Sequence, residues 1–191
     1  MRTKQLTNSY LFFYMLFHRP KNISEIAMVH SIRAHKAVNH KYDGHSYTFH
    51  LKSAVNVGFI FLYLIPKKDQ EDVIGGIWEH DTEEDANLTY NDIKKVTNER
   101  VANIAHACTN EKGKNRAERA NEKYYTDIRE TEYATFVKLC DRIANVEHSK
   151  NKKSRMFDVY KKEYQHFKDS LYTKNDPYIP MWIYLEDLLG L

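Results

Sequence analysis

The stretch Glu79-His80-Asp81-Thr82-Glu83-Glu84-Asp85 places five carboxylates and one histidine within seven residues. It directly follows an apolar run, Val73 to Trp78, whose composition is typical of a buried segment. A solvated run of charges is not normally attached so closely to a hydrophobic core. The acidic stretch is therefore the first candidate for a functional site.

Helical spacing would bring these polar side chains together in pairs. Residues four apart are neighbours on a helix, so His80 would lie beside Glu84, and Asp81 beside Asp85. Imidazole and carboxylate groups together favour manganese, iron or zinc over calcium, which prefers a shell of oxygens. The alternative interpretation is a negatively charged helix end that forms surface ion pairs with lysines, and the stretch alone is compatible with both.

Length and composition indicate one globular domain. The 191 residues suffice for a sizeable core, and 29% charged with 42% hydrophobic residues is an ordinary globular balance. The net charge is only +3, because 26 acidic side chains offset most of the 29 basic ones. A sequence-independent nucleic-acid binder carries a denser basic stripe, so we expect neither nucleic acid nor membrane as partner. A small anionic substrate fits this balance.

The apolar segments of the sequence are too short to cross a membrane. The longest, Tyr10 to Phe17 and Val55 to Ile65, fall short of the roughly 18–20 residues that a spanning helix needs. The first is followed by charged residues where a signal peptide has small ones. Cys108 and Cys140 lack the paired spacing of a zinc or redox motif, and we expect them as buried thiols. These features predict a cytoplasmic protein.

Apolar residues recur at helical spacing through most of the chain, which predicts an all-α fold. Asn22 is the expected cap of a helix from Ile23, Asp69 caps the helix that delivers the acidic stretch, and Thr89 opens a capping box. An apolar segment runs from Phe49 to Ile65, and helical patterns cover Glu99 to Cys108, Thr131 to His148, Met156 to Tyr172 and Pro180 to Leu189. We expect residues 21–191 to form one helical domain and residues 1–20 an aromatic-rich arm or extra helix.

Residues outside the acidic stretch are needed to complete a metal site, since a catalytic metal takes three or four protein ligands. Asp141 lies beside the apolar side of its predicted helix, where a carboxylate is costly to desolvate unless a partner such as a metal pairs with it. His50 adjoins the apolar segment that begins at Phe49, although a histidine at such a junction is more often structural. The polar segment Thr109 to Asn121 either contacts phosphates or forms an exposed connection.

Three segments together resemble a known family. They are similar to successive motifs of the HD superfamily of metal-dependent phosphohydrolases, and especially of its RelA/SpoT-type alarmone hydrolase domain: Lys41-Tyr42-Asp43-Gly44-His45-Ser46-Tyr47-Thr48-Phe49-His50, His80-Asp81-Thr82-Glu83-Glu84-Asp85 and Lys138-Leu139-Cys140-Asp141-Arg142-Ile143-Ala144-Asn145. The likeness spans roughly residues 23–172 and also fits the small stand-alone SpoT homologues of metazoans. The Glu-Asp pair three residues beyond His-Asp is its most specific feature. The resemblance implies a single HD-domain helical bundle.

The resemblance also implies roles for individual residues. The metal ligands map onto His50, His80, Asp81 and Asp141, and the pair that orients or activates the attacking water maps onto Glu84 and Asp85. The implied substrate contacts are Lys41, Tyr42, Lys112, Asn145 and Tyr160. Lys41 stands where the family usually has an arginine that stacks on the base, so the planar guanidinium is lost there.

The reaction implied by the resemblance is hydrolysis of a nucleotide phosphate. In the closest branch, a manganese-dependent enzyme removes the 3′-diphosphate from guanosine tetra- or pentaphosphate and releases pyrophosphate. Iron or zinc are alternative metals, and a dNTP, a 5′-nucleotide, an adenine alarmone or NADPH are alternative substrates. A metal-free module that binds nucleotide or a partner protein is the alternative outside the enzymes, but all four ligand positions and both acids are filled.

Overall fold

The computed structural model describes residues 21–191, so the arm or extra helix expected over residues 1–20 lies outside the described residues. Helix α2 (Ile23–Ala37) opens the described part, and the side chain of Asn22 caps it by accepting a hydrogen bond from the backbone N–H of Glu25. The predicted cap at Asn22 is thereby confirmed.

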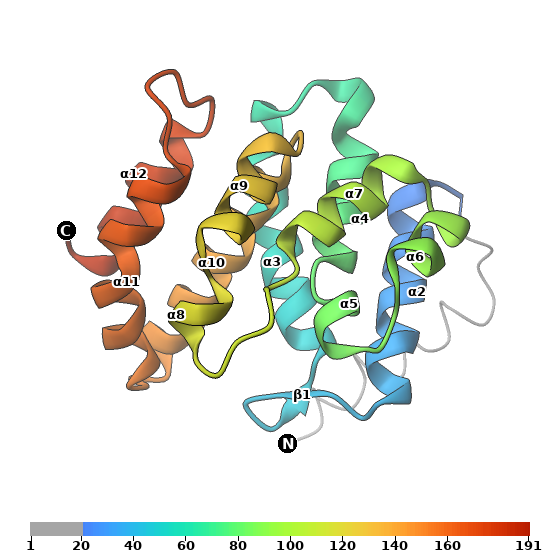
Figure 1. The fold of residues 1–191 in the computed structure, drawn as a ribbon, viewed down its shortest axis with the longest axis horizontal. Coiled ribbons are helices and arrows are strands. Elements are labelled where there is room, and N and C mark those ends of the chain that lie inside the picture. The colour runs from blue at the N-terminus through green and yellow to red at the C-terminus, as the bar shows by residue number, and fades with distance from the viewer. Residues whose placement is uncertain (1–20) are drawn as a thin grey trace.

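Helices account for nearly all regular structure in the described residues, as the sequence predicted (Figure 1). They are α3 (Thr48–Phe61), α4 (Gln70–Glu79), α5 (Thr82–Asp85), α6 (Tyr90–Val96), α7 (Glu99–Cys108), α8 (Arg116–Arg119), α9 (Glu122–Glu130), α10 (Ala134–Asn151), α11 (Met156–Leu171) and α12 (Ile179–Leu189). Two short 3₁₀ turns, Leu62–Leu64 and Lys67–Asp69, join α3 to α4.

A small hairpin interrupts the helices between α2 and α3. Strands β1 (Lys41–Tyr42) and β2 (His45–Ser46) pair antiparallel, with Lys41 opposite Ser46. Gly44 supplies the positive φ of +78° that the turn needs, in agreement with the turn predicted at this position. Two-residue strands are too short to produce a visible alternation, which is why the sequence showed a turn but no strands.

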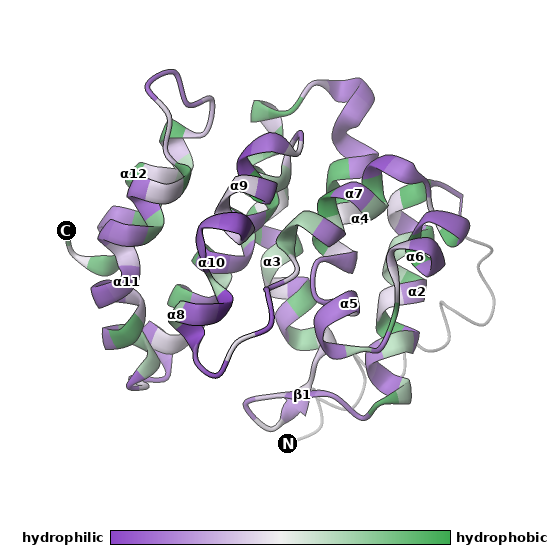
Figure 2. Cartoon of the chain, viewed as in Figure 1, coloured by the Kyte–Doolittle hydropathy of each residue, from purple (hydrophilic) through white to green (hydrophobic). Residues whose placement is uncertain are grey.

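The long helices stand side by side and bury their apolar stripes against one another. Helix α4 packs on α2 and α7, and α3 packs on α10, which in turn contacts α11 and α12. The fully buried side chains come from many of these helices and include Leu51, Ile77, Ile104, Phe136 and Trp182. Colouring by hydropathy shows the alternation of apolar and polar stripes along the helices (Figure 2). This continuous core holds α3, α4 and α10 in fixed positions relative to one another.

Two glycines allow α4 to approach its neighbours closely. A Cβ atom at Gly76 would lie 2.6 Å from Cγ2 of Ile104 on α7. A Cβ atom at Gly58 of α3 would overlap the Cδ1 atom of Ile77 on α4. A Cβ atom at Gly76 would press on several atoms of Ile104 near its backbone, whereas the one at Gly58 would meet the movable end of the Ile77 side chain, so the close approach depends most on Gly76.

The structure corrects one predicted cap. Asp69 precedes α4, but its side chain makes no capping hydrogen bond. Its carboxylate instead forms an ion pair with Arg100 of α7 and accepts a hydrogen bond of 2.8 Å from the hydroxyl of Tyr133. Asp69 thus joins three elements distant in sequence. By contrast, Thr89 and Asp92 form the predicted capping box at the start of α6.

The two cysteines are buried free thiols, as expected. Among the described helices, none is both long enough and apolar enough to pass through a bilayer.

Candidate active site

The acidic stretch forms two short helices with a break between them. Helix α4 ends at Glu79, and α5 begins at Thr82. At the break Asp81 has φ −110° and ψ 2°, outside the α-helical region. The hydroxyl of Thr82 closes the turn by donating to the carbonyl of Glu79 over 2.7 Å. The stretch is therefore not the single continuous helix from which the pairing of side chains was predicted.

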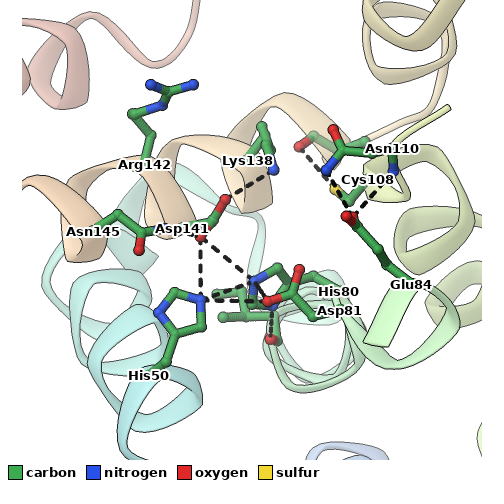
Figure 3. A network of polar contacts seen from close by, with 12 residues as sticks. His50, His80, Asp81, Glu84, Cys108, Asn110, Lys138, Asp141, Arg142 and Asn145 are labelled. Atoms are coloured by element: carbon green, nitrogen blue, oxygen red, sulfur yellow. Dashed lines mark hydrogen bonds and ion pairs between the residues drawn. The ribbon is translucent and has the colours of Figure 1, made fainter. Parts of the chain in front are cut away.

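Four predicted ligands converge at this break from three parts of the chain. His50 comes from α3, His80 and Asp81 from the end of α4, and Asp141 from α10 (Figure 3). The Nε2 atoms of His50 and His80 lie 3.4 Å apart, and Oδ1 of Asp141 is 3.2 Å from the first and 3.7 Å from the second. Oδ2 of Asp81 is 3.4 Å from Nε2 of His50 and 2.9 Å from that of His80.

The geometry of these donor atoms fits a metal ion. One ligand atom each from His50, His80 and Asp141 lie within 4.8 Å of one another, and all three residues are buried. Nδ1 of His80 is 2.8 Å from the carbonyl oxygen of Ile77, so this nitrogen carries the proton and Nε2 is free to bind a metal. Imidazole and carboxylate donors of this kind bind manganese, iron or zinc.

Neighbouring side chains fix the two carboxylates in place. Lys138, one turn earlier on α10, pairs with Oδ2 of Asp141 at 2.8 Å and leaves Oδ1 directed at the histidines (Figure 3). The hydroxyl of the buried Tyr47 donates to Oδ2 of Asp81. Such supporting contacts orient metal ligands and are typical of metal sites.

The electrostatics of the cluster favour a cation at its centre. Burial alone would lower the pKa of His80, but the charges of Asp81 and Asp141 and their hydrogen bonds outweigh it and raise the pKa to about 10. Burial would raise the pKa of Asp141, yet the charge of Lys138 and the hydrogen bonds from both histidines hold it well below its usual range. The carboxylates thus stay ionised and attract positive charge, which a divalent metal would supply in place of protons.

A cavity of about 270 Å³ opens beside this cluster and contains both predicted catalytic acids. Oε2 of Glu84 accepts hydrogen bonds from the side-chain amide of Asn110 at 2.7 Å and from its backbone N–H at 3.4 Å. Loss of hydration, followed by the charges of Asp81 and Glu84, raises the pKa of Asp85 to about 6. Asp85 accepts no side-chain hydrogen bond from the described residues. The two acids therefore differ: the carboxylate of Glu84 is held in place, and that of Asp85 is free of such hydrogen bonds.

The predicted substrate contacts divide into two groups. Asn145 and Tyr160 line the cavity, and the hydroxyl of Tyr42 donates to Oδ1 of Asn145 over 2.7 Å while its ring stacks on His50. Lys41 and Lys112 are exposed and are not among the residues that line the cavity. Tyr42, Asn145 and Tyr160 thus lie at the cavity beside the candidate metal cluster. A role for Lys41 and Lys112 in substrate binding stays a prediction.

Some cavity residues were not singled out from the sequence as site residues. Lys138, Arg142, Glu163 and His166 all line the cavity. Arg116 and Arg119 also line the cavity. From the sequence, their segment was compatible with either a contact to phosphates or an exposed connection. Arg142 directly follows Asp141, and Glu163 lies one helical turn after Tyr160. The spacing of Glu163 from Tyr160 is a sequence signal that could have identified Glu163, whereas consecutive residues on a helix point to different sides, so the position of Arg142 next to Asp141 gives no such signal.

Comparisons with known proteins support the fold. No protein-family model and no curated protein matches this sequence. Among solved structures, the chain is similar to a metazoan ortholog of SpoT that hydrolyses ppGpp and plays a role in starvation responses. The TM-score is 0.68 at 16% sequence identity, and the match covers 91% of this chain and 99% of that one. The described chain therefore has the all-α fold of a small stand-alone SpoT-type hydrolase, as the sequence motifs predicted.

Proposed function

We propose that this protein is a metal-dependent nucleotide phosphohydrolase that removes the 3′-diphosphate from guanosine tetra- or pentaphosphate. The observation that carries the proposal is the convergence of His50, His80 and Asp141 beside a cavity that is also lined by the carboxylates of Glu84 and Asp85. The similarity to a metazoan SpoT ortholog supports the choice of substrate. The products would be GDP or GTP and pyrophosphate.

The residues that would hold a divalent metal are His50, His80, Asp81 and Asp141, with manganese as the expected ion. Their donor atoms form two neutral and two anionic ligands, a set that suits manganese, iron or zinc. A metal in this position supplies Lewis acidity toward phosphoryl oxygens and acidifies water. Lys138 and Tyr47 would keep the two carboxylates oriented toward it.

Glu84 and Asp85 have separate tasks in this proposal. The carboxylate of Glu84 is held by Asn110, so it orients the attacking water in a fixed position. The carboxylate of Asp85 is free of side-chain partners among the described residues, so it accepts the proton that the water loses. General-base assistance of this kind typically contributes about 100- to 10,000-fold in rate.

The substrate would lie along the cavity wall formed by α10 and α11. Asn145 and Tyr160 present an amide and an aromatic ring there, and Tyr42 supports Asn145 through its hydroxyl. An aromatic ring and a neutral amide suit a nucleoside, which needs a stacking surface and hydrogen-bond partners. These contacts would hold the nucleoside and leave its 3′-diphosphate beside the histidines.

The test is release of pyrophosphate from guanosine tetraphosphate by the purified protein with added Mn²⁺. We expect turnover by the wild type, none by Asp141→Asn, and wild-type activity in the control Asp169→Asn, which changes an exposed carboxylate of α11. A parallel panel contains dNTPs, a 5′-nucleotide, an adenine alarmone and NADPH. Turnover confined to another member of the panel would overturn the alarmone assignment, and turnover that survives Asp141→Asn would overturn the site.

A further inference from the structure

A chain of hydrogen bonds leads from the β1–β2 hairpin to one of the candidate metal ligands. The hydroxyl of Tyr42 lies 2.7 Å from Oδ1 of Asn145, and Nδ2 of Asn145 in turn contacts Oδ1 of Asp141. This oxygen of Asp141 also faces His50 and His80, at 3.2 and 3.7 Å from their Nε2 atoms. The chain therefore ends on the very atom that would bind the metal.

The donor and the acceptor of each bond follow from the chemistry at its ends. A metal-binding carboxylate is ionised and can only accept, so the amide nitrogen of Asn145 must face Asp141. The amide oxygen of Asn145 then faces Tyr42, and the Tyr42 hydroxyl must donate to it. The second N–H group of the amide has no partner among the described residues, so it remains available to the nucleotide.

Asp141 is held from both sides along α10. Lys138, one turn earlier, pairs with Oδ2 at 2.8 Å, and Asn145, one turn later, donates to Oδ1 (Figure 3). Partners on both oxygens prevent the carboxylate from rotating. Lys138 needs no fixed rotation to attract a carboxylate, whereas an amide turned the other way would present its oxygen to Asp141 and repel it. The hydroxyl of Tyr42 is the contact that selects the correct rotation of Asn145.

The position of Tyr42 is itself fixed by neighbouring rings and by the hairpin. Its ring stacks on His50 with centroids 4.8 Å apart and meets the ring of His148 edge-on at 4.9 Å. The next residue, Asp43, accepts a hydrogen bond of 3.0 Å from Nε2 of His148. His148 follows Asn145 by three residues on α10, so the hairpin contacts the same face of this helix at two successive levels.

We propose that Tyr42 is a positioning residue for the bound divalent metal ion. Through Asn145, its hydroxyl fixes the direction of the Asp141 oxygen that binds the metal. This role is separate from the contact with substrate that the sequence resemblance implied for Tyr42. The inference deepens the proposed function and rests on its metal site, but not on which nucleotide is hydrolysed.

The test measures binding of Mn²⁺ to the metal-depleted protein by calorimetric titration in the absence of nucleotide. Tyr42→Phe removes only the hydroxyl and keeps the ring that stacks on His50. Tyr184→Phe is the matched control, because the Tyr184 hydroxyl also donates to a side chain of α10, that of Glu147, but outside the cavity. Circular dichroism checks that both variants are folded.

The expected result is a weaker affinity for the metal in one variant only. Tyr42→Phe should raise the Kd for Mn²⁺ about 10- to 100-fold, because loss of a group that orients a metal ligand typically costs this much. Tyr184→Phe should leave the Kd unchanged. Excess Mn²⁺ should restore hydrolysis of guanosine tetraphosphate by Tyr42→Phe, a rescue that a general loss of stability would not show.

Two outcomes of the titration would overturn the inference in different ways. An equal Kd in wild type and Tyr42→Phe would overturn the inference alone, and a raised KM for the nucleotide beside that equal Kd would mark the hydroxyl as a substrate contact. Absence of Mn²⁺ binding by the wild type would overturn the inference together with the metal site of the proposed function.

A second variant tests the path through Asn145. Asn145→Ala should weaken Mn²⁺ binding by a similar factor, because Oδ1 of Asp141 loses its partner on α10. Adding Tyr42→Phe to Asn145→Ala should have no further effect, since the hydroxyl then has no route to Asp141. Additive losses in the double variant would overturn the inference, because they would show that Tyr42 acts on the metal without Asn145.

Discussion

At the residue scale, the candidate site depends on side chains whose neighbours restrict their orientation. Tyr47 illustrates this, because its hydroxyl donates to Asp81 while its ring stacks on His35 and His40, with centroids 4.4 and 3.8 Å away. An aromatic stack of this kind places the hydroxyl by packing as well as by hydrogen bonding. Single substitutions can therefore separate residues that act in the reaction from residues that stabilise the fold.

Asp85→Asn should lower kcat on the hydrolysed nucleotide by about 100- to 10,000-fold, because the amide cannot accept a proton from water. KM, manganese content and melting temperature should remain close to wild type, since Asp85 is exposed to the cavity. Glu83→Gln is the matched control: it changes a neighbouring carboxylate that pairs with His106 of α7 instead of lining the cavity. Loss of bound metal in Asp85→Asn would contradict the role as proton acceptor.

His35 should make the protein sensitive to mild acid. Burial lowers the pKa of His35 to about 4, and the charge of Asp81 offsets this only in part. The unfolded chain binds the proton near its usual pKa of about 6.5, so protonation favours unfolding as the pH falls from there toward 4. The free energy of unfolding should drop by about 2 kcal/mol between pH ~7 and pH ~5 from this residue alone.

His35→Phe preserves the aromatic stack and removes the titrating group, so urea unfolding of this variant should lose that part of the pH dependence. Wild-type protein at the same two pH values is the reference. An identical pH dependence in both proteins would show that His35 does not carry it.

The candidate site could be predicted from the sequence where the residues that bear the chemistry form short motifs. His80-Asp81 and Glu84-Asp85 were identified by their density of charge, and Asp141 by its place beside an apolar stripe. Arg142 and Glu163 were not identified, because their place in the lining of the cavity depends on which helices meet there. A charged residue on an exposed helix face has the same local pattern whether it meets solvent or a ligand.

At the scale of elements, the prediction succeeded for the long helices and for the short helix α6, whose capping box marks its start, but it missed α8. Helices α10 and α11 follow their predicted spans closely, because an apolar stripe repeats over several turns. Helix α8 spans only Arg116–Arg119 and has no buried residue, so no periodicity marks it. Its start is set by Asn115, whose side chain accepts a hydrogen bond from the backbone N–H of Glu118. Such elements depend on caps more than on hydrophobic pattern.

The contact between α4 and α7 gives a prediction at this scale. Gly76→Ala would place a Cβ atom 2.6 Å from Ile104, and overpacking of a core typically costs about 1–3 kcal/mol. Because α4 ends at the candidate metal ligands, activity should fall together with stability. Glu71→Ala, on the exposed side of the same helix, should change the free energy of unfolding by less than about 0.5 kcal/mol. Equal unfolding midpoints for the two variants would show that α4 can shift away from α7.

At the scale of the whole molecule, the candidate metal ligands come from segments that are distant in sequence but pack against one another in the core. His50, His80 and Asp141 lie on α3, at the end of α4 and on α10. Anything that binds all three in the native state stabilises the fold by mass action, since the unfolded chain does not present them together.

Manganese should therefore raise the melting temperature of the metal-depleted protein. At about 100 times its dissociation constant, a ligand adds about 2.7 kcal/mol, which corresponds to roughly 5–10 °C for a chain of this size. Addition of a chelator should reverse the shift, and Asp141→Asn should reduce or abolish it. A shift of equal size in Asp141→Asn would place the binding of manganese elsewhere.

The positions of the three ligand-bearing segments also affect how the molecule would respond to force. Helices α11 and α12 carry none of the candidate ligands and follow α10 in the chain. A metal that ties α3, α4 and α10 together would act as a mechanical cross-link, so pulling on the C-terminus should detach α12 and α11 first and then meet a stiff, metal-dependent unit. Removal of the metal should lower the force that unfolds the unit of α3, α4 and α10, and it should leave the force that detaches α12 and α11 unchanged.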